Sequence, residues 1–163
     1  MLVLLLALLL ACTGTDGDTG GGDSADTEAP SGPGTLALTF RMDADYIATM
    51  AKDGQSPTGT FGGSIYAEDD ATGIGPNEGA VPLLDFSVPG VDLTVDGGPT
   101  AVLLVTDPLE PQVVWILGCL DADVPEDGCG DVGDPITIPN ENKAQVIAEA
   151  ETPFQVYMGM IRP

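Results

Sequence analysis

The sequence predicts an all-β fold, an antiparallel β-sandwich of about seven or eight strands, preceded by a signal peptide and a disordered tether. Apolar and polar residues alternate with a period of two in several stretches, which is typical of strands with one buried face. Glycine and proline cluster between these stretches at intervals of about 8 to 15 residues, as expected of a β-sandwich. The predicted organisation is a signal peptide at 1–11, a tether at 12–35 and a β-sandwich domain at 36–163.

The strands up to residue 120 fall into two groups. Alternating patterns or turn-bounded runs predict strands at residues 36–42, 59–66 and 84–88. The short apolar runs AVLLVT and VVWILGCL predict central strands, covered on both faces, at residues 101–106 and 113–120. Two prolines in the intervening DPLEP stretch should stop strand pairing between the runs.

The C-terminal part of the domain adds two more predicted strands. Residues 143–151 have a helix-forming composition, but Val146, Ala148 and Ala150 alternate, which favours a strand. The final strand, 154–160, should place four apolar residues on one face: Phe154, Val156, Met158 and Met160.

The first residues of the chain indicate export. The apolar run from Leu2 to Ala11 is far shorter than the ~20 residues that a membrane-spanning helix needs, so it predicts a signal-peptide core. Residues 9–12, Leu-Leu-Ala-Cys, resemble the lipobox of bacterial lipoproteins, although no Lys or Arg precedes the apolar run. The resemblance implies that Cys12 is acylated, for example with palmitate, and becomes the mature N-terminus. The alternative is an ordinary cleaved signal with an incidental cysteine.

Residues 13–35 predict the tether that a lipidated cysteine needs. The segment contains no aromatic residue and no aliphatic residue larger than alanine, so it cannot bury a core. Its charges are all acidic, and their repulsion should extend it. Thr13 after Cys12, rather than Asp, matches the enteric lipoprotein rule for outer-membrane sorting. The expected location is therefore the bacterial cell envelope, with the lipid anchor in the outer membrane.

The charge of the domain restricts its partners. Five of the 26 acidic residues lie in the tether and all four basic residues lie in the domain, which gives the domain a net charge of −17. Such a balance excludes nucleic acid as a probable class of partner. It is compatible with a solvated acidic surface, with basic partners, or with divalent cations that offset self-repulsion.

The two cysteines in the domain predict a disulfide. If Cys12 carries lipid, Cys119 and Cys129 are an even pair in an exported chain, and such pairs normally oxidise. Closing this loop should stabilise the domain by roughly 2.5 to 3 kcal/mol. Two cysteines without any histidine supply too few ligands for a thiolate metal site.

The acidic stretch 118–135 allows two interpretations. Oxygen ligands suitable for calcium are available at Asp121, Asp123, Glu126, Asp127, Asp131 and Asp134. The EF-hand spacing fails, since Pro125 and Val132 occupy ligand positions and Glu126 stands where a glycine is needed. A disulfide-stapled, solvated turn is therefore favoured, with no cofactor, and a calcium- or glycan-binding surface is the alternative.

The residue inventory argues against an enzyme. The chain has no histidine, so Ser-His-Asp and Cys-His arrangements cannot form. Glu68, Asp69 and Asp70 could supply a carboxylate pair for glycoside hydrolysis, but aromatic residues for a sugar cleft are few. Trp115 is expected in the core, and packing roles are expected for the three tyrosines: Tyr46, Tyr66 and Tyr157.

A second resemblance points to the same class of function. The run VVWILGCLDAD followed by GDVGDP resembles the core strand and acidic loop of bacterial transthyretin-like or carboxypeptidase-regulatory-like modules. The resemblance implies a non-catalytic accessory domain. The expected function is a lipid-anchored, extracytoplasmic lipoprotein with a structural or binding role, whose partner is the membrane and an unidentified protein or glycan.

Overall fold

A computed structural model describes residues 29–94, 103–122 and 133–160. In order along the chain, the helices and strands of these residues are β1 (Thr35–Met42), α1 (Ala44–Lys52), β2 (Thr58–Ala67), η1 (Glu68–Asp70), β3 (Leu84–Asp92), β4 (Leu104–Val105), β5 (Val113–Asp121), β6 (Pro135–Thr137), β7 (Lys143–Gln145) and β8 (Glu151–Met160).

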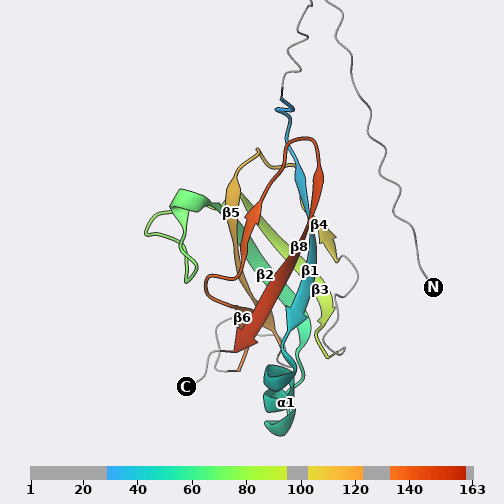
Figure 1. Ribbon diagram of the computed structural model, residues 1–163. Coiled ribbons are helices and arrows are strands. Elements are labelled where there is room, and N and C mark those ends of the chain that lie inside the picture. The colour runs from blue at the N-terminus through green and yellow to red at the C-terminus, as the bar shows by residue number, and fades with distance from the viewer. Residues whose placement is uncertain (1–28, 95–102, 123–132, 161–163) are drawn as a thin grey trace, which may run out of the picture.

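The strands form one nearly closed sheet, which confirms the all-β prediction. The strand order is β3-β2-β5-β6-β8-β1-β4, and β7 pairs with β5 beside β6. One pairing departs from the antiparallel prediction, because β1 and β8 are parallel from Thr35 opposite Glu151 to Met42 opposite Met158. Both strands therefore start at the same end of the molecule, where the chain enters from the tether (Figure 1).

The core lies between the two halves of this sheet. Its residues come from the inner faces of β1, β2, β3, β5 and β8, and the largest fully buried side chains include Phe40, Phe61 and Ile116. Burying this apolar surface supplies the main driving force for folding. On β8, Val156 and Met158 are buried and Phe154 and Met160 pack partly against the core, as the alternation predicts.

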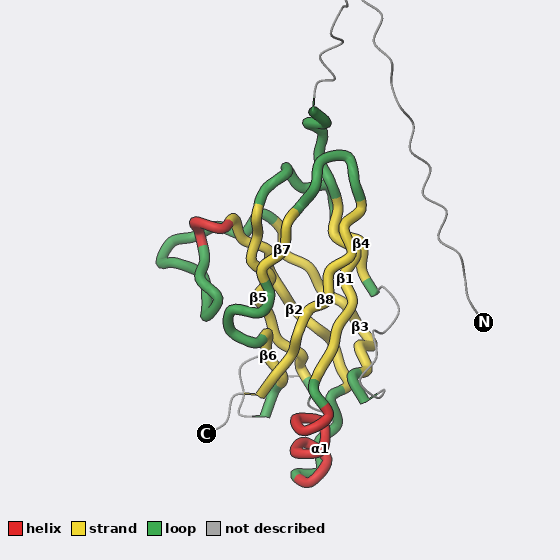
Figure 2. The backbone as a smooth tube through the Cα atoms, viewed as in Figure 1, coloured by secondary structure: helices red, strands yellow, loops and turns green. Residues whose placement is uncertain are grey.

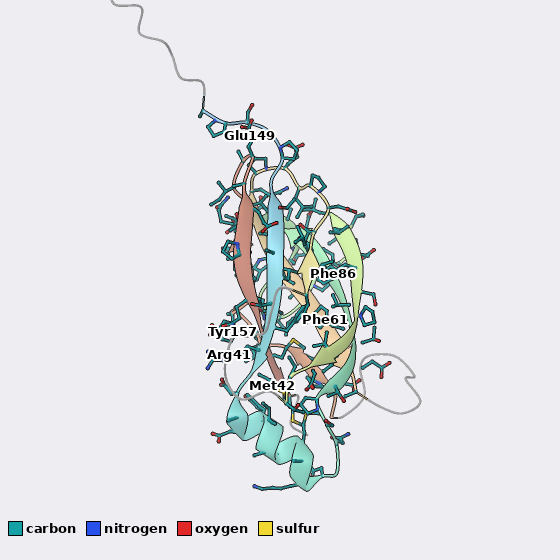
Figure 3. The ribbon with its side chains drawn as sticks, turned by 90° about the vertical axis from the view of Figure 1, so that its right-hand side faces the viewer. Arg41, Met42, Phe61, Phe86, Glu149 and Tyr157 are labelled. Atoms are coloured by element: carbon teal, nitrogen blue, oxygen red, sulfur yellow. The ribbon has the colours of Figure 1, made fainter. Side chains whose placement is uncertain are left out.

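An aromatic stack fills the space left by two glycines. Gly63 and Gly118 lie opposite each other on β2 and β5. The Phe61 ring lies 4.7 Å from the Phe40 ring and 5.7 Å from the Phe86 ring, between centroids. Figure 3 shows Phe61 and Phe86 in the interior of the sheet. A Cβ atom on Gly118 would lie 2.6 Å from Phe61 Cζ, so the stack requires glycine there.

Helix α1 was not among the predicted elements. It closes the end of the sheet opposite the tether (Figure 1), with Met50 buried and Tyr46 and Ile47 packed partly against the core. This spacing places the three residues on one helical face. Gly54, at φ 77°, lets the chain turn back after the helix. The short amphipathic pattern of α1 was not recognised because the segments on both sides of it have strand patterns.

Two predicted strands differ from the structure. The run at 101–106 was expected to be central, but β4 has two described residues at a sheet edge, with Val105 47% exposed. The apolar run did not distinguish the two positions, because an edge strand also needs apolar inward-facing residues. Residues 143–151 form a three-residue strand, β7, followed by a turn in which Glu149 has φ 55°, before β8 begins.

A buried asparagine joins the C-terminal strands where β6 and β7 leave a gap. Asn142 is 1% exposed. Its Nδ2 donates hydrogen bonds to the carbonyl oxygens of Ile138 (3.2 Å) and Tyr157 (3.0 Å), and its Oδ1 accepts one from the Tyr157 N–H (2.8 Å). The side chain thus adds a second hydrogen bond to each of these two carbonyl oxygens and supplies the acceptor for the Tyr157 N–H.

Candidate functional site

The predicted signal peptide and Cys12 lie outside the described residues, so lipidation stays a prediction. The chain enters the sheet at Gly34, whose N–H donates to the Leu109 carbonyl at 2.9 Å. Strand β1 follows at once. Within the ranges given above, no helix has the length and apolar character to cross a bilayer.

The structure describes two of the predicted calcium ligands. Asp121, at the end of β5, is 8% exposed, and Asp134, before β6, is 4% exposed. The Ala122 N–H donates to Asp134 Oδ1 at 3.4 Å, so the two ends of the acidic stretch are joined. The other candidates fall outside the described residues: Asp123, Glu126, Asp127 and Asp131. Among described residues, no three acidic, Cys or His groups cluster as a metal site. Calcium binding stays the untested alternative to a disulfide-stapled, solvated turn.

The predicted disulfide lies partly outside the described residues. Cys119 is on β5, opposite Gly62 of β2 and Ile136 of β6. Cys129 is outside the described ranges. Because Ile136 of β6 lies beside Cys119 of β5, the two described ends of the acidic stretch lie next to each other.

At the same end of the molecule, β3 finishes in a short turn. Asp92 Oδ1 accepts hydrogen bonds from the hydroxyl and the backbone N–H of Thr94. Both bonds stabilise the carboxylate and lower the pKa of Asp92, and the bond from the hydroxyl has the larger effect.

The prediction that Trp115 belongs to the core is wrong. Trp115 is half-buried on the outer face of β5, because its neighbours Val114 and Ile116 point inward and are fully buried. The continuous apolar run concealed this alternation. Nothing within the run distinguishes its two faces, and only the residues that strand pairing places beside Trp115 reveal the outer one.

That row forms a candidate binding site, which we call the aromatic row. Tyr66 of β2 lies opposite Trp115, and Lys143 of β7 lies on its other side. Lys143 Nζ is 5.3 Å from the Trp115 ring centroid and also forms an ion pair with Glu68. Sugar-binding surfaces combine such aromatic faces with polar side chains that reach hydroxyl groups.

The other two tyrosines behave differently. Tyr46 packs against the core from α1, in agreement with the prediction. Tyr157 lies on the outer face of β8, where the Arg41 guanidinium carbon is 5.9 Å from its ring centroid (Figure 3). The packing role of Tyr157 is thus to stack on Arg41.

A projecting segment, residues 68–83, follows β2 and is called the side loop here. It stands away from the sheet in Figures 1 and 2. The three carboxylates considered for catalysis lie at its start, where the Glu68 carboxylate pairs with Lys143. Asn77 holds the backbones of Asp69 and Asp70. Its Nδ2 donates a hydrogen bond to the Asp69 carbonyl oxygen (2.8 Å), and its N–H donates one to the Asp70 carbonyl oxygen (2.9 Å).

Comparison with protein-family models, curated proteins and solved structures finds no match for this chain. The resemblances to bacterial lipoproteins and to transthyretin-like modules therefore stay predictions.

Proposed function

We propose that the chain is a lipid-anchored, extracytoplasmic lipoprotein of the bacterial cell envelope, held in the outer membrane, with a non-catalytic structural or binding role. The observation that carries the proposal is the order of segments: an apolar run ends at Cys12, an acidic tether follows, and β1 opens directly after it. The entry of the chain at one end of the sheet supports this role, because the sides and the α1 end stay available to partners (Figure 1).

The residues argue for binding rather than catalysis. The chain has no histidine to serve as a general base at neutral pH. Glu68 is tied to Lys143 rather than facing a second carboxylate across a cleft. The aromatic row and the side loop instead offer surface chemistry suited to recognition.

Replacing Cys12 by Ser tests the anchor. The protein should move from the membrane fraction to a soluble or unprocessed form, because the acyl chains supply the membrane affinity. The intact mass should lose the acyl groups at the same time. Thr15→Ser is the matched control, since it changes the tether and leaves the cysteine. Unchanged partitioning of Cys12→Ser would contradict the proposal.

The disulfide is part of this proposal. The pairing of Cys119 with Ile136 brings the two ends of the acidic stretch together on β5. Cys129 precedes Ile136 by only seven positions in the sequence. Peptide mapping without reductant should recover the two cysteines as one linked pair. A free thiol at either position in freshly exported protein would overturn it.

Glycan binding is the second candidate, and the outer-face position of Trp115 favours it. The chain has one tryptophan, so its fluorescence reports directly on the aromatic row. Titration with chitohexaose and cellohexaose should change that emission, and Tyr66→Ala should weaken the response. Tyr46→Phe, on α1, is the control and should leave it intact. Emission that neither sugar changes rejects this candidate.

A further inference from the structure

The side loop exposes apolar side chains in an unusual concentration. Six large hydrophobic residues are exposed among those the structure describes, and three lie here: Ile74 at 83%, Val81 at 74% and Leu83 at 42%. Single exposed apolar residues are common on soluble proteins, but several on one projecting element indicate an interaction surface.

The side loop is held in place by contacts with distant parts of the chain. Within it, the Thr72 N–H donates to Gly75 O at 2.8 Å, forming the tight turn that carries Ile74. The Asn140 N–H donates to Gly73 O at 3.1 Å, and the Glu68–Lys143 ion pair fixes the start of the loop to β7. Ile74 is thus presented by a preorganised element, which lowers the entropy lost when a partner binds.

Acidic side chains are exposed in the same loop as these apolar residues. Asp69, Asp70 and Glu78 are exposed in the same loop, and Glu141 is exposed in the turn that holds Gly73. An apolar centre with a charged rim is the usual anatomy of a protein interface. The negative charge of these side chains selects a basic partner, in keeping with the domain's net charge of −17.

We infer that the side loop docks a basic segment of another protein, whose apolar side chains contact Ile74 and Val81 while its Lys or Arg residues face Asp69, Asp70 and Glu78. The inference rests on the binding role proposed above but not on the lipid anchor. A bilayer surface is a poorer occupant, since anionic lipids repel an acidic loop.

The test uses the purified mature chain and two labelled peptides of about a dozen residues, one alternating Lys and Leu, the other Lys and Ser. Fluorescence anisotropy at about 0.15 M salt reports binding while screening long-range attraction. The Lys-Leu peptide should bind and the Lys-Ser peptide should bind at least tenfold more weakly, because it lacks the apolar anchors.

Paired variants place the binding on the side loop. Ile74→Ser with Val81→Ser should weaken Lys-Leu binding tenfold or more. Ile147→Ser with Val105→Ser, which removes exposed side chains of comparable type elsewhere, should leave it unchanged. All four residues are exposed, so these changes should not unfold the domain.

A charge-matched pair tests the rim. Removing three charges by Asp69→Asn, Asp70→Asn and Glu78→Gln should weaken binding severalfold. The control removes three exposed charges near the tether end: Asp107→Asn, Glu110→Gln and Glu151→Gln.

Four outcomes would overturn the inference: no binding of the Lys-Leu peptide, equal binding of both peptides, equal loss in the two charge variants, or Ile74-dependent binding to phosphatidylglycerol vesicles. None of them changes the fractionation of Cys12→Ser, so failure here is distinguishable from failure of the anchor.

Discussion

Gly118 is the position where the structure makes the sharpest stability prediction. A Cβ there would lie 2.3 Å from the Gly62 carbonyl oxygen, 2.6 Å from Phe61 Cζ and 2.8 Å from Gly63 Cα. Two of these atoms are backbone of the paired strand, and the Phe61 ring cannot shift freely because it packs between Phe40 and Phe86. Overpacking of this kind costs about 1 to 3 kcal/mol, and we expect Gly118→Ala near the upper limit.

Gly62→Ala is the matched control, since a Cβ there meets nothing within 4 Å. It should be neutral or stabilise the domain by about 0.5 to 1 kcal/mol, because alanine restricts the unfolded chain more than glycine does. Thermal unfolding followed by circular dichroism should give Gly118→Ala a Tm roughly 10 °C lower than wild type, and Gly62→Ala a Tm at or above it. Equal Tm values for the two variants would refute the packing argument.

Three further predictions concern other parts of the chain. Asn142→Leu leaves the Tyr157 N–H without the acceptor that Asn142 supplies, so urea unfolding should show a loss of about 2 kcal/mol, and a loss under about 1 kcal/mol would contradict the bridging role of Asn142. Gly73→Ala would place a Cβ within 2.3 Å of the turn that holds the side loop and should make the loop sensitive to limited proteolysis, whereas Gly75→Ala, with open space around it, should not. Calcium should shift the Tm of the oxidised protein by about a degree or less, because the predicted disulfide already orders the acidic stretch; a shift of roughly ten degrees that Asp121→Asn with Asp123→Asn abolishes would establish a cation site instead.

The strands were predictable because their pattern is local. Residues 36–42 and 154–160 alternate clearly, and the structure places both with the expected residues inward. Their parallel pairing was not predictable, since it depends on where the chain returns after the turn at 146–150. Alternation defines the faces of a strand but not its neighbours.

The sites were harder to predict because a continuous apolar run does not reveal which of its residues face outward. VVWILGCL suggested a fully covered strand, yet Trp115 lies on the outer face beside Tyr66, a residue almost fifty positions earlier in the chain. Only the register of β2 against β5 reveals that two aromatic residues share a surface. A sequence pattern within one strand contains no such information.

The order of the side loop was also not predictable from its local sequence. Its sequence, rich in glycine and acidic residues, has the composition of an ordinary solvated turn. Its order instead comes from Lys143 and Asn140, which lie about seventy residues later and contact Glu68 and Gly73. Such contacts decide whether Ile74 moves freely in solvent or is held in one position. A side chain that is already held loses less conformational entropy when a partner binds. The Gly73→Ala variant therefore tests function as well as structure. If it frees the loop, it should weaken binding of the Lys-Leu peptide although every side chain of the proposed surface is still present.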